Sequence, residues 1–338
     1  MCRGLPRASD NCRVISFFSI PKPCVGHIGV IQRNAVRSWA ALACACGGEV
    51  MLMGNDAGVA QLAQEVKATH IPGVATTHYG TPRVDDLFDQ AQRRARHKLL
   101  RYVNADIVLL SDFVAAADAA SRGRRQLLMV GQRWDTPITE SLPFDEAVPC
   151  PPLPLGEGGE SASRERVLGQ VTDARDGSKH PLPSPLPKGE GAGAVDVWEQ
   201  AARELAAREG KLHKPTGIDY FLFTPRLFDP IPPFAIGRTA WDNWLIYRAR
   251  SRRAAVIDAT RDVLAIHQNH DYAHGGGYKA VWKGSEARTN FELAGGDAHI
   301  FTIWDASHVL EHGKLRENTT TSLGGGIWNY RRSARYGV

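Results

Sequence analysis

The sequence contains no apolar run long enough to cross a membrane. A spanning helix needs about 20 mostly apolar residues, and no such stretch occurs among the 338 residues. The opening residues, MCRGLPRASDNCR, also lack the apolar segment of a secretory signal peptide. We therefore expect a cytoplasmic protein without a transmembrane segment, for which peripheral association with a membrane stays open.

Two further signatures are missing. The six cysteines include no C-x-x-C pair, which argues against a zinc site and leaves reduced thiols as the default. The net charge is only +5, and the basic run 122–125 has no interleaved aromatic residues, so we expect no nucleic-acid partner. A mildly basic chain fits an anionic substrate instead.

One segment differs from the rest in composition. Residues 149–194 are rich in Pro, Gly, Ser and charge, and the string Pro-Leu-Pro-x-Gly-Glu-Gly occurs at 152–158 and again at 185–191. This repeat has no hydrophobic face that could stack into a solenoid. We interpret 149–194 as a disordered insertion, resembling a translated DNA repeat, within a single domain of residues 13–312, followed by a peripheral tail at 313–338.

The remaining sequence predicts an α/β protein. Apolar runs at 14–20, 49–53 and 107–110 are typical of buried strands, and residues 85–102 predict one long amphipathic helix. Ligands of such sheets bind at the carboxyl ends of the strands. Asp56 follows the run 49–53 and is a candidate contact to a base or ribose, although it could equally cap the next helix.

Asn104 and Asp106 form the first candidate site. They immediately precede the apolar run 107–110, and side chains two residues apart on extended backbone point the same way. A carboxylate in such a place suits a hard divalent cation that it shares with substrate phosphates. The alternative is that both residues only make a turn.

Asp242 forms the second candidate site. The order Gly217–Tyr220, Gly237-Arg238 and then Trp241–Trp244 places this acid at the predicted start of a helix. A carboxylate there could act as a general base. It could instead cap the helix.

These motifs, in this order, resemble those of nucleotide-sugar glycosyltransferases of the GT-A fold. The resemblance covers residues 13–148 and 195–312, and Asn104 stands in place of the first acid of the family's Asp-x-Asp element. It implies a GT-A-like three-layer nucleotide-diphospho-sugar transferase fold with a mixed, mostly parallel central sheet. It also implies transfer of a sugar from a nucleotide-diphosphate donor to the hydroxyl of a glycan or other acceptor, with inversion.

The same resemblance implies roles for individual residues. Asp106, completed by His267 or His270, would hold a divalent cation, Mn²⁺ or Mg²⁺, and Asp242 would be the general base. The implied donor contacts are Ser19, Pro21, Asp56, Arg93, Asn104 and Asp106. The implied acceptor contacts are Asp219, Arg238, Trp241 and Asn243.

Two other classes of protein stay open. A nucleotidyltransferase also uses a nucleotide-binding α/β sheet, but it usually has a glycine-rich, basic loop after the first strand, which SIPKPCVGHIG matches poorly. A non-catalytic carbohydrate-binding protein on a decayed transferase scaffold is favoured by Asn104 and by the inserted repeat.

Overall fold

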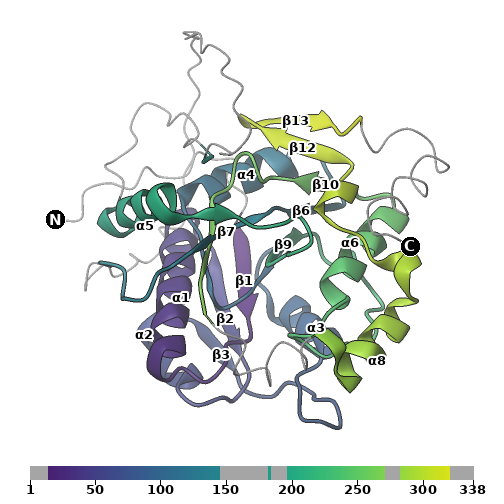
Figure 1. The fold of residues 1–338 in the computed structure, drawn as a ribbon, viewed down its shortest axis with the longest axis horizontal. Coiled ribbons are helices and arrows are strands. Elements are labelled where there is room, and N and C mark those ends of the chain that lie inside the picture. The colour runs from purple at the N-terminus through teal and green to yellow at the C-terminus, as the bar shows by residue number, and fades with distance from the viewer. Residues whose placement is uncertain (1–13, 145–181, 184–195, 271–281, 320–338) are drawn as a thin grey trace.

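The computed structural model describes residues 14–144, 182–183, 196–270 and 282–319, and every element below lies in these ranges (Figure 1). The predicted insertion at 149–194 therefore falls outside the described residues, except for Leu182 and Pro183. Leu182 packs, partly buried, against a hydrophobic cluster of the domain.

A nine-stranded sheet forms the centre of the described structure, in the order β13-β12-β10-β6-β9-β4-β1-β2-β3. Strand β9 is antiparallel to both of its neighbours, β4 and β6, and β13 is antiparallel to β12, whereas the other neighbouring pairs are parallel. In chain order these strands are β1 (Ile15–Ser19), β2 (Glu49–Met53), β3 (Thr69–Ile71), β4 (Leu99–Val103), β6 (Leu127–Val130), β9 (Tyr220–Phe223), β10 (Ala255–Asp258), β12 (His308–Glu311) and β13 (Lys314–Glu317).

Helices cover both faces of this sheet. One face carries α1 (Gly26–Cys46), α2 (Val59–Glu65) and α4 (Ser111–Ser121), and the other carries α3 (Val84–Arg94), α6 (Trp241–Ser251) and α8 (Ser285–Ala294) (Figure 1). The predicted fold class, α/β with a mixed and mostly parallel central sheet, is confirmed. Two 3-10 turns, η2 (Asp297–His299) and η3 (Ile303–Asp305), follow α8.

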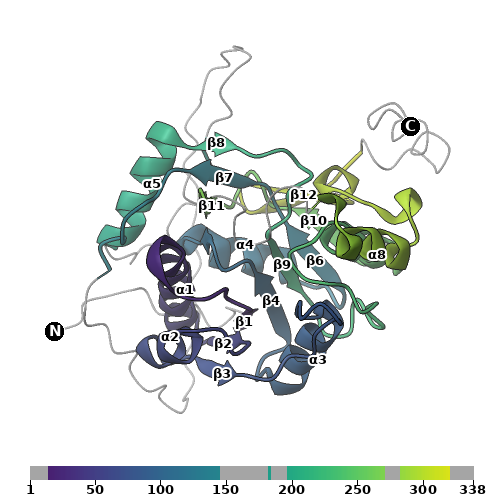
Figure 2. The same cartoon turned by 60° about the horizontal axis from the view of Figure 1, so that its bottom comes forward.

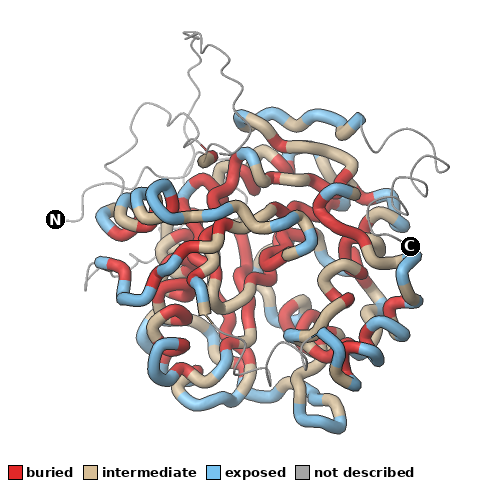
Figure 3. The backbone as a smooth tube through the Cα atoms, viewed as in Figure 1, coloured by how far each residue is buried: buried red, intermediate tan, exposed pale blue. Residues whose placement is uncertain are grey.

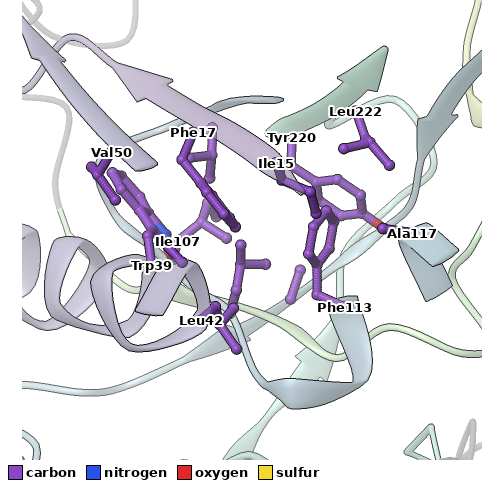
Figure 4. Close-up of a cluster of buried hydrophobic side chains, with 14 of the residues drawn as sticks. Ile15, Phe17, Trp39, Leu42, Val50, Ile107, Phe113, Ala117, Tyr220 and Leu222 are labelled. Carbon is purple, nitrogen blue, oxygen red and sulfur yellow. The ribbon is translucent and has the colours of Figure 1, made fainter. Parts of the chain in front are cut away.

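The central strands are buried on both faces, which explains their continuous apolar sequences (Figure 3). Successive side chains of a strand point to opposite faces. In β1, Ile15 and Phe17 therefore enter the cluster under α1 and α4, while Phe18 enters the cluster under α3 and α6. Figure 4 shows Ile15 and Phe17 packed in the first of these clusters, together with Trp39 from α1.

The prediction of one helix over residues 85–102 is wrong. Helix α3 ends at Arg94, and Leu99–Val103 forms β4, a central strand whose five residues are all buried. The basic residues before and within this strand form a pattern that is typical of the solvent-exposed face of a helix. Arg101 is in fact fully buried, with its guanidinium carbon 3.7 Å from the centre of the Phe113 ring. Packing against aromatic rings thus allows an arginine in the core, although sequence patterns would place this residue type on the surface.

A second, four-stranded sheet lies beside α5 (Val197–Glu209), as Figure 2 shows. Of the apolar run 107–110, only Ile107 and Val108 form a strand, which belongs to this sheet, and α4 then begins at Ser111. Trp134 and Ile266 of this sheet pack against Trp198 of α5 in a third hydrophobic cluster. Its strands, in spatial order, are β5 (Ile107–Val108), β11 (Ala265–Gln268), β7 (Arg133–Thr136) and β8 (Lys211–Leu212).

The large sheet continues beyond residue 312, where the sequence placed the end of the domain. Lys314–Glu317 form β13 at the sheet edge, paired with β12. None of the helices in the described ranges has the length and apolar character that crossing a bilayer requires.

Candidate functional site

The register of the small sheet brings the candidate residues together. His267 on β11 pairs with Asp135 on β7 and with Ile107 on β5, and Asp106 directly precedes Ile107. The small sheet is in turn fixed to α1, because Gln268 donates to the carbonyl of Ile31 at 2.7 Å. Residues far apart in the chain thus meet beside the carboxyl end of β4.

Asp106, His267 and His270 form a cluster whose potential ligand atoms all lie within 4.8 Å of one another. Nε2 of His270 lies 3.0 Å from Oδ2 of Asp106, and Nε2 of His267 lies 3.9 Å from the same oxygen. The other oxygen, Oδ1, is buried and has no hydrogen-bond partner in the described part of the chain. One carboxylate and two imidazoles are a suitable ligand set for a divalent metal ion.

The electrostatic surroundings keep Asp106 ionised. Burial acts to raise its pKa, but the hydrogen bond from His270 and the charges of His267 and Lys22 outweigh burial and hold the pKa well below its usual value. An ionised carboxylate is the form that binds a cation.

Asp135 lies behind His267. Its Oδ1 is 2.9 Å from Nε of Arg133 and 3.1 Å from Nδ1 of His267, although this last pair is not aligned as a hydrogen bond. Its Oδ2 is 2.7 Å from Nδ1 of His213, which follows β8. Burial acts to raise the pKa of Asp135, but contacts with both histidines and the charge of Arg133 hold it far below its usual value.

Asn104 faces a second carboxylate. Its Nδ2 donates to Oδ1 of Asp219 at 2.7 Å, and its Oδ1 accepts from the Tyr102 hydroxyl at 2.9 Å. Nη1 of Arg133 donates to Oδ2 of Asp219 at 2.8 Å. Asn104 therefore acts in this structure as a bridge between β4 and the segment before β9, and Arg133 links Asp219 to Asp135.

Asp242 lies in the first turn of α6 but is not its N-cap residue. The N-cap is Ala240, in a positive-φ conformation (φ 82°), and it makes no side-chain cap hydrogen bond. The carboxylate of Asp242 nevertheless accepts a hydrogen bond from the first-turn amide of Asn243 at 2.9 Å. Burial raises the pKa of Asp242 to about 7, the hydrogen bond from the Asn243 amide opposes this, and the charge of Asp219 adds to it.

The Tyr102 hydroxyl is influenced electrostatically by both Asp242 and Asp106 of the cation cluster. Burial raises the pKa of the Tyr102 hydroxyl well above its usual value, and the charges of Asp106, Asp219 and Asp242 raise it further. The charges of three carboxylates from three different segments therefore act on one hydroxyl.

The predicted donor contacts are divided by the fold. The turn that contains buried Pro21 is held by Gln32, whose side chain binds both the amide and the carbonyl of Lys22. Ser19 is buried, and its hydroxyl donates to the carbonyl of Val103 at 2.6 Å, so it serves the sheet. Asp56 is exposed beyond β2, on the same edge of the sheet as Asn104. Since the N-cap of α2 is Gly58, Asp56 does not cap it.

Arg93 is not brought to the site. It is exposed near the carboxyl end of α3 and pairs with Asp89 one turn earlier. Its neighbour Gln92 accepts a hydrogen bond from the amide of Arg226. Arg226 follows β9, which is antiparallel to β4, so it lies at the amino end of β4, away from the candidate site. The geometry therefore does not support a donor contact by Arg93.

Two of the predicted acceptor contacts are occupied by the fold. Trp241 is only 4% exposed and packs against Phe88 and Tyr102 in the core. Arg238 pairs with Glu286 of α8 at 2.9 Å. The prediction of Trp241 as an acceptor surface fails because its ring fills the core between the sheet and α3.

Asn243 and Asp219, the other two predicted acceptor contacts, both influence Asp242, the first through a hydrogen bond and the second through its charge. The charge of Asp219 acts on Asp242, and the amide of Asn243 donates to Oδ1 of Asp242 at 2.9 Å. Asn243 also donates through its side chain to the carbonyl of Phe301 at 2.7 Å.

Four residues of the site were not predicted: Lys22, Arg133, Asp135 and His213. Arg133 and Asp135 alternate in a short polar strand, and that spacing was the available signal. Lys22 lies in the turn 19–23 that supplied the predicted donor contacts Ser19 and Pro21, but it was not itself named. His213 had no sequence signal, because only the pairing of β8 with β7 places it here.

Comparison with known proteins gives only coarse likeness. No protein family and no curated protein matches the chain. TarS 1–349 of S. aureus is similar over 36% of this chain and 36% of its own, with 12% identity and a TM-score of 0.29. TarS has also been solved in complex with UDP-GlcNAc. A mycobacterial protein is similar over 84% of this chain and 76% of its own, with 13% identity and a TM-score of 0.39. Likeness at this level carries no argument about function.

Proposed function

We propose that this protein is a glycosyltransferase that moves a sugar from a nucleotide-diphosphate donor to an acceptor hydroxyl, with inversion. The observation that carries the proposal is the Asp106–His267–His270 cluster. Asp242 supports it, because the charges of Asp242 and of Asp106 both act on the Tyr102 hydroxyl. A cation site and a carboxylate of raised pKa in one place supply the two parts that such a transfer needs.

The ligand set fits a divalent cation. Asp106 offers an oxygen that is buried and unpartnered in the described structure, and His267 and His270 offer imidazole nitrogens. When bound, the cation would neutralise charge on the departing diphosphate. Imidazole ligands favour a transition metal, so we expect Mn²⁺ to serve better than Mg²⁺.

Lys22 extends this positive environment. The charge of Lys22 acts on Asp106, and the exposed side chain stands on the rigid turn after β1. In this proposal its ammonium group binds a phosphate of the donor and also stabilises the leaving group.

Asp242 is the proposed general base. Its pKa of about 7 leaves much of it ionised at neutral pH while keeping it basic enough to take a proton. It accepts the proton of the acceptor hydroxyl as that oxygen bonds to the anomeric carbon and the bond from this carbon to the diphosphate oxygen breaks. One displacement from the opposite face inverts the anomeric configuration.

A thermal-shift panel tests the proposal. The full chain is heated with UDP-, GDP-, dTDP- and CMP-sugars, each with MnCl₂, with MgCl₂ or with EDTA. We expect one nucleotide class to raise the melting temperature, more strongly with Mn²⁺. For Asp106→Asn we expect affinity for that donor in Mn²⁺ to fall about tenfold or more. Asp89→Asn, on the exposed face of α3, is the matched control.

The outcomes separate the three classes of protein. Sugar transfer or slow donor hydrolysis with release of nucleoside diphosphate supports a glycosyltransferase. Release of pyrophosphate from a nucleoside triphosphate and a sugar phosphate would identify a nucleotidyltransferase. Binding of sugars without any turnover would identify a non-catalytic protein, and an unchanged donor affinity in Asp106→Asn would remove Asp106 from the site.

A further inference from the structure

Asp135 is not one of the three residues of the cation cluster, yet it lies beside one of them, His267. We propose that Asp135 is a positioning residue that fixes the ring of His267, so that Nε2 of this histidine faces Asp106 as a metal ligand. The inference rests on the cation site of the proposed function.

The two ring nitrogens of His267 face two different carboxylates. Nδ1 lies 3.1 Å from Oδ1 of Asp135, and Nε2 lies 3.9 Å from Oδ2 of Asp106. A neutral imidazole carries its proton on one nitrogen and a lone pair on the other. A proton on Nδ1, on the side that faces Asp135, leaves the lone pair on Nε2.

The distance across the cluster suits a bound ion. Metal–nitrogen and metal–oxygen bonds of this kind are about 2.1 Å long, so a cation fits between two atoms 3.9 Å apart. His270 approaches the same carboxylate oxygen at 3.0 Å and supplies the third ligand. The opposite tautomer of His267 would put a proton between the cation and its ligand.

Asp135 is itself held rigidly. Arg133 and His213 occupy its two oxygens at 2.9 and 2.7 Å, and the β7–β11 pairing sets Asp135 opposite His267. The side chain of Arg133 is only 12% exposed and continues to Asp219. A carboxylate fixed by two cationic or donor groups keeps its place when the neighbouring histidine binds an ion.

Metal titration of the full chain tests the role of Asp135. Co²⁺ and Mn²⁺ alone are titrated by calorimetry into the wild type, Asp135→Ala and Asp135→Asn, and Co²⁺ binding is also followed by its visible absorption. We expect Asp135→Ala to bind Co²⁺ about 10–100-fold more weakly. Asp135→Asn should lose less, because its carbonyl still accepts from Nδ1–H. Asp89→Asn should bind as the wild type does.

Nitrogen-15 NMR gives a second readout that needs no metal and no substrate. In the metal-free wild type, at a pH high enough for the imidazole to be neutral, His267 should carry its proton on Nδ1, and in Asp135→Ala this preference should be lost. Circular dichroism and the melting temperature show whether each variant is folded, and Asp135→Asn serves if Asp135→Ala is not.

The results distinguish this inference from the proposed function. Equal Co²⁺ affinity in folded Asp135 variants would overturn the positioning role and leave the cation site in place. Weaker Co²⁺ binding in the variants, with no sugar transfer by the wild type, would support the role and overturn the glycosyltransferase. No Co²⁺ binding by the wild type would overturn both.

Discussion

Replacing Asp242 by Asn separates the two roles that the sequence left open for this residue. The variant keeps the shape of the side chain but never carries a charge. Burial raises the pKa of Asp242 from 3.8 to about 7, which at about 1.4 kcal/mol for each pH unit sets an upper limit of about 4 kcal/mol on the cost of ionising it in the folded state. The side chain is partly exposed, so screening by water reduces this cost to about 1–3 kcal/mol.

The sign of the effect on stability follows from proton binding. Between pH 4 and 7 the folded protein keeps a proton on Asp242 that the unfolded chain releases, so this residue makes the wild type less stable as the pH rises to 7. The Asn variant has no such dependence. The free energy of unfolding of the variant, relative to the wild type, should therefore increase from pH 5 to pH 8 and then level off. Urea unfolding at several pH values measures this difference.

Turnover should respond in the opposite direction. If Asp242 is the base, Asp242→Asn should reduce the transfer rate by roughly 10²–10⁴-fold while donor affinity is retained. The wild-type rate should rise with pH through about 7, and the variant should lose that rise. Asp89→Asn is the control for both measurements. Near-normal turnover in Asp242→Asn would show that Asp242 is not the base, and a stability difference independent of pH would show that its pKa is not raised.

Three further perturbations test the packing and the charges. Arg101→Met should raise the free energy of unfolding by about 1–3 kcal/mol in urea titrations, because the buried guanidinium has no hydrogen-bond partner among the described residues; a loss of stability would contradict this. Burial raises the pKa of Asp112 to about 6 despite Arg203, so the contribution of Asp112 to stability should fall from pH 4 to 6, and the stability of Asp112→Asn relative to the wild type should rise over this range. Lys22→Gln should weaken binding of the stabilising nucleotide sugar about tenfold by calorimetry, and unchanged affinity would remove Lys22 from the site.

The sequence predicted most of the scaffold because strands buried on both faces are continuous apolar runs. It predicted 14–20 and 49–53 as strands, and β1 and β2 lie there. It failed at β4, where Arg101 and the basic residues before it hide a central strand. Arg101 can be buried in this strand because aromatic rings surround its guanidinium, and the local sequence has no periodic pattern that indicates these contacts.

The candidate site shows the same division. Asp106 was chosen because it directly precedes an apolar run, and His267 and His270 were chosen from the family resemblance; the structure brings these three together. Arg93 and Trp241 were also chosen from the resemblance, and the structure places Arg93 near the opposite ends of the strands and Trp241 in the core. Residue type and local position therefore identify candidate residues but not the direction in which their side chains point.

Local periodicity was sufficient to identify the α/β class, the strands at 14–20 and 49–53, and the acids beside apolar runs, Asp56 and Asp106. Packing of the domain decided that His267 stands between Asp106 and Asp135. It also decided that Asn104 bridges to Asp219. Both depend on the register between strands more than 100 residues apart in the chain, and that register is set by packing of the whole domain rather than by any single segment.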